Sequence, residues 1–155
     1  MCEKCRCTDG YDLPPLTVNI HEIPTDHSRA QPTREGQGRF FVESVFGVSE
    51  AAAEKRHSLD HRIAKMVEII DASPDDHFMI WCDLEAERKA IDAVLPTSRS
   101  VYGTQPLDER EQLVRDFAEG RLKYLSSKTS MMGAGVNLQH FCHRALYVGI
   151  NFKFN

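Results

Sequence analysis

The chain has 155 residues, of which 41% are hydrophobic and 27% charged, and its formal net charge is -4. This length and composition predict one globular domain with a substantial core, and they argue against a dedicated DNA binder with a strongly basic surface. No apolar run approaches the roughly 18 residues that a membrane-spanning helix needs. No signal-peptide pattern opens the chain, so we expect a cytoplasmic protein without a membrane partner.

The first half of the chain predicts two strands and one long helix. Leu16 to Ile23 and Arg39 to Phe46 have strand patterns, and residues 24–38 between them have the composition of a loop. Ser49 is a suitable N-cap for a helix that runs to about Asp71. Apolar residues recur along it every three or four positions, which marks one buried helical face: Leu59, Ile63, Met66, Val67 and Ile70. Its basic side chains are expected to be solvated or to face DNA: Lys55, Arg56, His57, Arg62 and Lys65.

The second half alternates short apolar strands with helices. Asp83 is expected to cap a helix through Leu95, assisted by Glu87, and Gly120 is expected to end a helix that starts at Pro106 and has Leu107 on its inner face. The predicted strands are residues 77–82, 100–102, 122–126 and 144–149. This alternation predicts right-handed crossovers between parallel strands. The expected fold is therefore a three-layer α/β domain with a mainly parallel central sheet.

The most informative stretch runs from Ser126 to Leu138 and is rich in hydroxyl-bearing residues and glycine. It directly follows one predicted strand. Open α/β sheets bind phosphate-bearing ligands at the carboxyl ends of their strands, where loops expose backbone N–H groups. The stretch therefore predicts a phosphate-binding loop.

This loop resembles motif V of superfamily-two helicases, in the form found in Swi/Snf-type translocases and their phage-borne relatives. Two upstream blocks are similar to the same family and stand in the same order. Residues 77–87 resemble motif IV, and residues 101–120 resemble the stretch with a strand-end glycine, a helical Arg–Glu pair and a Phe-x-x-Gly end. Residues 10–16 also resemble a segment just ahead of this lobe in phage and prophage helicases. Most of the chain thus resembles the second RecA-like (P-loop NTPase-like) lobe of a DEAD/DEAH-type helicase.

The resemblance implies an N-terminal extension over residues 1–38 and a RecA-like lobe over residues 39–155. It also implies an ATP-dependent DNA helicase or translocase in which this lobe contacts the nucleic-acid backbone and ATP only together with a first RecA-like lobe. ATP and magnesium are the cofactors expected for the intact parent protein. DNA and the first lobe are the expected partners.

The isolated chain is expected to lack ATP hydrolase activity. The 155 residues contain no Gly-x-x-x-x-Gly-Lys-Ser/Thr loop and no Asp-Glu box, both of which belong to the family's first lobe. The sequence stops at Asn155, before motif VI would supply arginine fingers, each of which contributes roughly 10³ to 10⁵ in rate. We therefore expect no cofactor for the chain alone and, at most, weak and salt-sensitive affinity for DNA.

The resemblance assigns nucleic-acid contacts to four residues at strand ends. These are Gly103 and Thr104 after one strand, and Lys128 and Thr129 after another. Phosphate oxygens accept hydrogen bonds from hydroxyl, ammonium and backbone N–H groups, so the residue types fit. Simpler interpretations stay open, because the Thr129 hydroxyl can satisfy its own turn and Lys128 can be merely solvated.

Gly133, Gly135 and Asn137 are the expected nucleotide contacts. The two glycines allow the backbone to approach a ligand closely, although they also fit a tight turn without a ligand. Asn137 can bridge to the nucleotide or cap the next short helix. No catalytic or metal-binding residue is assigned.

Five cysteines are present, and their spacing does not resemble a secreted disulfide framework. Cys82 and Cys142 lie in apolar segments and are expected to be buried. Cys2, Cys5 and Cys7 would need a fourth zinc ligand, such as His21 or His27. Two other functions therefore stay open beside the helicase lobe. One is a small zinc-binding module, and the other is a non-catalytic prophage remnant or protein-interaction module that self-associates through an apolar surface.

Overall fold

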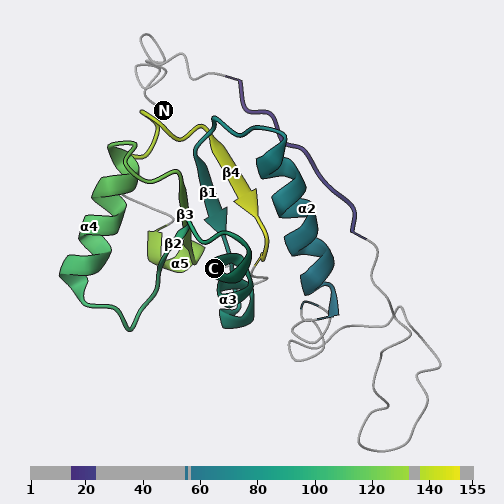
Figure 1. Ribbon diagram of the computed structural model, residues 1–155, viewed down its shortest axis with the longest axis horizontal. Helices are drawn as coiled ribbons and strands as arrows, with labels where there is room; N and C mark the ends of the chain where they lie inside the picture. Colours follow the sequence, from purple (N-terminus) through teal and green to yellow (C-terminus); the bar gives the residue numbers. More distant parts are fainter. Residues whose placement is uncertain (1–14, 24–54, 56, 133–136, 151–155) are drawn as a thin grey trace, which may run out of the picture.

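The computed structural model describes residues 15–23, 55, 57–132 and 137–150 (Figure 1). Within these ranges strands and helices alternate along the chain. The helices are α2 (Leu59–Asp71), α3 (Glu85–Val94), α4 (Leu107–Ala118) and α5 (Thr129–Met132). The strands are β1 (Phe78–Trp81), β2 (Arg99–Val101), β3 (Tyr124–Ser127) and β4 (Arg144–Tyr147).

The strands form one parallel sheet in the order β2-β3-β1-β4. Trp81 lies opposite Ser127 on one side and Tyr147 on the other, and Val101 also lies opposite Ser127. Because the strands are parallel and in register, their carboxyl ends meet at one edge of the sheet. The expected α/β fold with a parallel sheet is confirmed.

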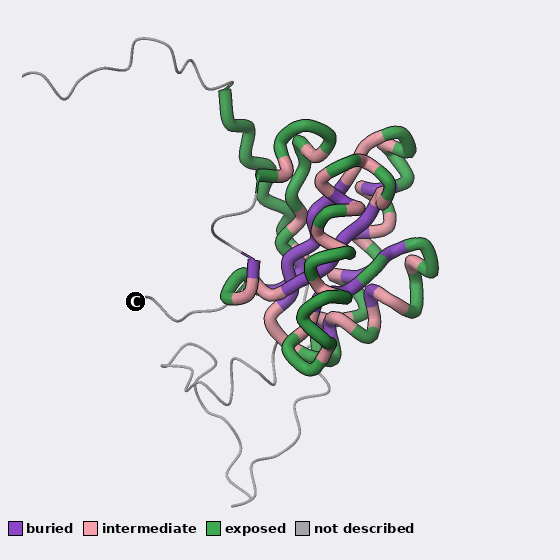
Figure 2. Tube along the Cα trace, turned by 90° about the vertical axis from the view of Figure 1, so that its left-hand side faces the viewer, coloured by how far each residue is buried: buried purple, intermediate pink, exposed green. Residues whose placement is uncertain are grey.

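Helices cover both faces of the sheet, which gives three layers. On one face α2 and α3 enclose a core that includes Ile70, Ile80 and Ile91. On the other face α4 and α5 enclose a second core around Phe117 and Leu125. Figure 2 shows the buried residues as a band through the middle of the described domain. β1 is buried along its whole length, as expected for a parallel strand with helices on both faces.

The helix ends follow from local chemistry. α2 buries Ile63, Met66 and Ile70, the predicted apolar stripe, and ends shortly before Pro74. α4 is followed by Gly120, whose φ of +76° is a left-handed conformation that favours glycine. A Cβ atom at Gly120 would also lie 2.7 Å from the Phe141 ring, so packing and backbone conformation both select glycine there.

Three expectations are wrong in detail. No strand forms between Pro15 and Ile23, and Leu16, Val18 and Ile20 are 88%, 70% and 86% exposed. A strand needs a partner for its backbone groups, and no described strand lies beside this segment. Leu107 is 59% exposed rather than inward, because it stands at the first turn of α4, ahead of the part that packs on the sheet.

The third error concerns the start of α3. Leu84, not Asp83, is the N-cap residue, and the Asp83 carboxylate instead pairs with Lys55 at 2.7 Å. The expected strand over 39–46 and the expected helix start at Ser49 lie outside the described residues. None of the described helices has the length and apolar character needed to cross a bilayer.

Leu125 and Leu107 provide a matched test of the packing. Leu125→Ala should lower the free energy of unfolding by about 2–5 kcal/mol, because Leu125 is fully buried in the central sheet. Leu107→Ala should change it by about 0.5 kcal/mol or less, because its side chain is mostly in solvent. Urea unfolding followed by circular dichroism measures both values, and equal losses would contradict this arrangement of α4 on the sheet.

Candidate functional site

The four predicted nucleic-acid residues come together at the carboxyl edge of the sheet. Gly103 and Thr104 follow β2, whereas Lys128 and Thr129 follow β3. β2 and β3 are adjacent, and Val101 is in register with Ser127, so the segments that follow the two strands leave the sheet side by side. Thr129 is the first residue of the short helix α5, so the segment predicted to be a phosphate-binding loop is helical from Thr129 to Met132. Gly103, Thr104 and Thr129 are exposed, and Lys128 is half-buried. The pairing of β2 with β3 thus makes one surface of two segments that are far apart in the sequence.

Lys128 is the cation of this surface. It lies close enough to the Glu85 carboxylate and the Cys82 thiol to act on both electrostatically. Within the described part of the chain its ammonium group forms no ion pair, whereas the neighbouring Arg88 is bound by Glu85 and by Asp92 at 2.7 Å. Lys128 is therefore a cation beside the end of β3 that no described carboxylate neutralises through an ion pair.

The predicted nucleotide residues are less well placed. Gly133 and Gly135 lie outside the described residues. Asn137 is exposed, and its side-chain oxygen accepts a hydrogen bond from the Gln139 N–H at 3.3 Å. That contact is a local turn interaction, as in the simpler interpretation of this residue.

The loop after β1 is closed to anions by the protein itself. The Glu87 carboxylate accepts hydrogen bonds from the N–H groups of Asp83 at 2.8 Å and Leu84 at 2.9 Å. These are donors that a phosphate would use at a helix amino terminus. Because a buried carboxylate already occupies them, we expect no anion to bind at the start of α3.

Arg62 on α2 neutralises this carboxylate. Its guanidinium lies 2.6 Å from the Glu87 oxygen, and it also donates to the backbone oxygens of Val148 and Lys55. Its Nε donates to Ser58 at 3.1 Å. The expectation that the basic side of this helix is solvated is therefore wrong for Arg62, whose side chain points inward. Glu87 is fully buried, so a charged partner is required.

Gly149, two residues after the end of β4, also lies against the Glu87 carboxylate. A Cβ atom there would fall on the Glu87 carboxylate, 2.6 Å from its carboxyl carbon. The Gly149 N–H donates to the Trp81 oxygen at 3.2 Å, so the backbone has little room to withdraw. A glycine immediately after an apolar strand was the sequence signal for this close approach, although it did not identify the carboxylate.

Cys82 ends β1 at a position where many α/β enzymes place a reactive group, but its chemistry is that of a core residue. Burial is the main cause that raises the pKa of its thiol to about 11, and the Glu87 carboxylate adds to the rise. The thiol is 3.6 Å from the Ser127 oxygen. A thiol that stays protonated at neutral pH is a poor nucleophile, so the environment of Cys82 is that of a structural core cysteine.

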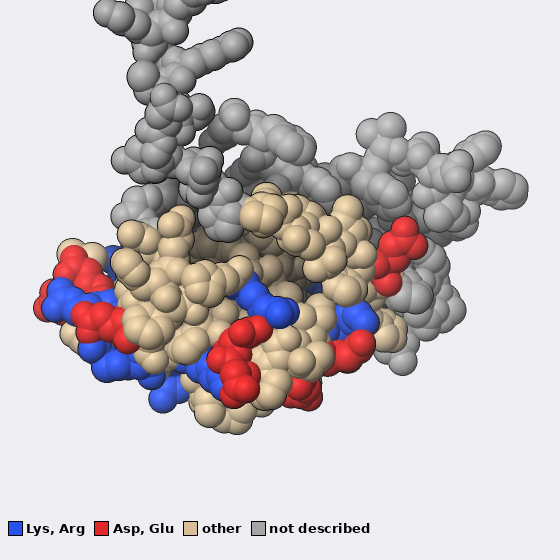
Figure 3. Space-filling view, turned by 90° about the horizontal axis from the view of Figure 1, so that it is seen from above, with Lys and Arg blue, Asp and Glu red and all other residues tan. Residues whose placement is uncertain are grey.

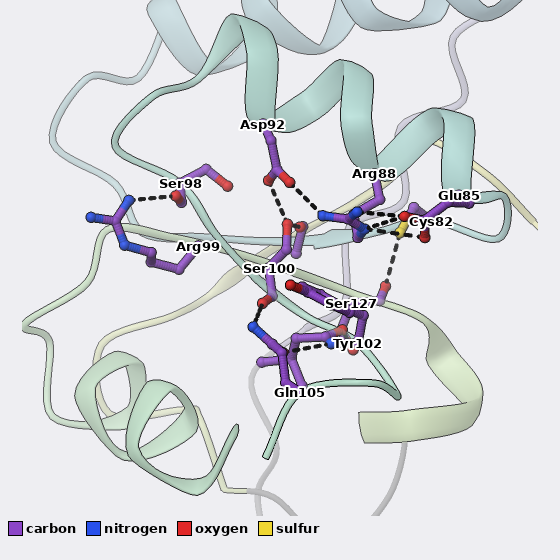
Figure 4. Close-up of polar contacts among 12 residues, drawn as sticks. Cys82, Glu85, Arg88, Asp92, Ser98, Arg99, Ser100, Tyr102, Gln105 and Ser127 are labelled. Atoms are coloured by element: carbon purple, nitrogen blue, oxygen red, sulfur yellow. Dashed lines mark hydrogen bonds and ion pairs between the residues drawn. The ribbon is translucent and has the colours of Figure 1, made fainter. Parts of the chain in front are cut away.

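Figure 4 shows a polar network that links α3 to the outer strand β2. Asp92 accepts hydrogen bonds from Arg88 and Ser100, and Ser100 is 2.7 Å from Ser126. The Arg88 guanidinium also lies 4.3 Å above the Tyr102 ring. A groove of about 380 Å³ follows this network, but the polar groups on its Arg88 side already bind one another. The network therefore satisfies the buried hydroxyl groups of Ser100 and Ser126. The buried Ser98 hydroxyl, which also lines the groove, has no hydrogen-bond partner in the described structure.

The opposite, amino-terminal edge carries paired charges. Figure 3 looks onto this edge and shows positive and negative side chains interspersed. Arg144 pairs with Asp76 at 2.6 Å, and Arg121 pairs with Asp116 at 2.6 Å. No cluster of three or more metal-ligating side chains occurs among the residues with described positions. Cys2, Cys5, Cys7 and His27 lie outside them, so the zinc alternative stays untested.

Comparisons with known proteins do not identify a family. No family model matches the sequence, and no curated protein is similar enough to count as a relative. The chain is thus a small α/β domain with a four-stranded parallel sheet in its described part and alternating βα units.

Two glycines at the carboxyl edge test the Glu87 site. Gly149→Ala should lower the free energy of unfolding by about 1–3 kcal/mol, because the added methyl group meets a carboxylate that Arg62 and two N–H groups hold in place. Gly103→Ala should cost little, because no atom lies within 4 Å of the added methyl group. Urea denaturation measures both, and a tolerated Gly149→Ala would mean that the Glu87 carboxylate is free to move.

Alkylation tests the state of Cys82. With a thiol pKa of about 11, roughly one thiol in a thousand is ionised at pH 8, so iodoacetamide should leave Cys82 unmodified in the folded protein. In urea the same residue should react at the rate of an ordinary cysteine. Peptide mass mapping separates Cys82 from the other cysteines, and equal labelling in both states would refute its burial.

Proposed function

We propose that this chain is the second RecA-like lobe of an ATP-dependent DNA translocase and that its β2–β3 carboxyl edge contacts the phosphate backbone. The observation that carries the proposal is the meeting of Gly103 and Thr104 with Lys128 and Thr129 on adjacent parallel strands. The resemblance assigns all four residues to nucleic-acid contact. The parallel sheet with helices on both faces is the fold that the resemblance implies.

The chemistry of the edge supports backbone contact rather than base recognition. It offers one ammonium group, two exposed threonines and a glycine whose surroundings are open. Such groups bind phosphate oxygens and carry no sequence information. Glu87 occupies the N–H groups at the start of α3, so the proposed phosphate contacts lie in the segments after β2 and β3.

ATP and magnesium remain proposals for the intact parent protein. Asp83 and Glu87, the carboxylates nearest the carboxyl end of β1, are paired with Lys55 and Arg62. They do not fit a magnesium site, so the metal ligands would come from the first lobe. In that arrangement this chain contributes the contacts to the DNA backbone. Closure of the two lobes around the nucleotide would make the strength of those contacts depend on which nucleotide is bound.

Binding of labelled single-stranded DNA, followed by fluorescence anisotropy at several salt concentrations, tests the proposal. The full chain should bind weakly, with affinity that falls as salt rises. Lys128→Ala should weaken binding and lower the slope of log affinity against log salt by about 0.7, the value for one lost phosphate contact on a single strand. Thr129→Ala should weaken binding without a comparable change in slope.

Lys89→Ala is the matched control, because Lys89 is also a lysine without an ion pair in the described structure but lies exposed on α3. It removes the same charge and should leave both affinity and slope nearly unchanged. If Lys89→Ala and Lys128→Ala have equal effects, binding depends on overall charge and the proposed edge is wrong. Absence of salt-dependent binding by the full chain would remove the proposal altogether.

A further inference from the structure

A strand-like segment of the chain has no partner. Leu16, Val18 and Ile20 alternate with Thr17 and Asn19, the pattern of a strand with one apolar and one polar face. The segment runs along the outer side of α2 (Figure 1), and every residue from Pro15 to Glu22 is exposed. Three large apolar side chains in a row on one face therefore lie in solvent, which is unusual unless a partner covers them.

One edge of the sheet is closed by side chains. On β2 the Gln105 amide donates to the Ser100 oxygen at 3.0 Å and accepts from the Tyr102 N–H at 2.9 Å. Arg99 donates to the Ser98 oxygen at 2.9 Å. The outward oxygens of Ser98 and Ser100 and the N–H of Tyr102 are thus occupied, which leaves another strand few groups to pair with there.

The β4 edge is open in the described structure. The Val148 N–H donates to the Trp81 oxygen at 2.9 Å, so even-numbered residues of β4 turn their backbone groups toward β1. Ala145 and Tyr147 therefore turn theirs outward. Their side chains lie on the sheet face of Met79 and Trp81, with which they are in register. Both residues are exposed, Tyr147 to 59%, so an apolar surface continues up to this edge.

We propose that Leu16–Ile20 of one copy adds as a strand to the β4 edge of a second copy. The apolar face of the segment would cover Ala145 and Tyr147, as cross-strand pairs of aliphatic and aromatic residues do. Each chain carries both the unpaired segment and the open edge, so two copies satisfy each other reciprocally in a symmetric dimer. In the described structure the segment lies in solvent along the outer side of α2, where it is accessible to the β4 edge of a second copy.

Analytical ultracentrifugation of the full chain under reducing conditions tests this pairing. The wild-type chain should dimerise with rising concentration. Val18→Asp should raise the dimer dissociation constant at least about tenfold, because it places a charge on the apolar face. Asn19→Asp is the matched control, since it adds the same charge on the polar face and should leave the constant nearly unchanged.

Ala145→Pro tests the edge, because proline removes an outward N–H while an edge strand tolerates it. It should also produce monomers, with the circular dichroism of the folded chain retained. Val18→Asp and Ala145→Pro chains mixed together keep one intact segment and one intact edge, so the mixture should form heterodimers more readily than either variant forms homodimers. Trp81, the single tryptophan, lies 6.3 Å from the Tyr147 ring and should report dimerisation by fluorescence.

Three results would overturn the proposal. The first is a wild-type chain that stays monomeric up to about 1 mM. The second is an equal effect of Asn19→Asp and Val18→Asp. The third is a folded Ala145→Pro chain that dimerises like the wild type. Hydrogen exchange distinguishes one further outcome. If the chain stays monomeric and the amide groups of residues 16–20 are protected, the segment pairs with the β4 edge of its own chain and not with a second copy.

Discussion

The structure depends on one buried carboxylate. Glu87 is fully buried, and its two oxygens bind Arg62 and the N–H groups of Asp83 and Leu84. It therefore joins α2, the end of β1 and the start of α3, while Gly149 brings the end of β4 against it. Removing one partner of such a pair leaves an uncompensated charge in the core, which costs far more than losing a surface ion pair. This contact therefore helps to fix the positions of α2, β1, α3 and β4 relative to one another.

The same carboxylate decides where the molecule can receive an anion. A helix amino terminus after a parallel strand normally presents free N–H groups. Glu87 occupies those of α3, and Cys82 beside it is a protonated core thiol. Among the residues with described positions, the segments after β2 and β3 offer exposed polar groups at the same edge, and Lys128 has no ion pair there. The Swi/Snf-like resemblance and the local chemistry thus favour the same two loops, which is the basis of the proposed contact with a phosphate backbone.

The two edge strands of the sheet, β2 and β4, differ in how many of their outward backbone groups are free to pair with another strand. Gln105 and Arg99 bind the outward backbone groups of β2, so this edge is protected against further pairing. β4 has no comparable protection among the described residues, and exposed Ala145 and Tyr147 extend an apolar surface to it. The unpaired segment from Leu16 to Ile20 has the pattern that such an edge accepts. This contrast between the two edges is the basis of the proposed pairing between two copies of the chain.

The sequence by itself determined α2 from residue 59, the alternation of β1 to β4 with α3 and α4, and the parallel arrangement of the strands, because hydrophobic periodicity and helix stop signals are local. It did not predict the short helix α5, since residues 126–138 have the composition of a loop. It also determined that the residues after β2 and β3 would share an edge, since parallel strands end on the same side. Only the tertiary structure decided which charges are internal. Arg62 and Glu87 are 25 residues apart, and nothing in a basic helical pattern distinguishes the one side chain that turns inward. The segment Leu16 to Ile23 shows the same limit of sequence-based prediction. Its alternating pattern indicates which side chains a strand would bury, but it does not indicate whether a neighbouring strand is present to pair with it. Pairing partners and buried charges depend on the contacts between distant elements, and those contacts exist only once the chain has folded.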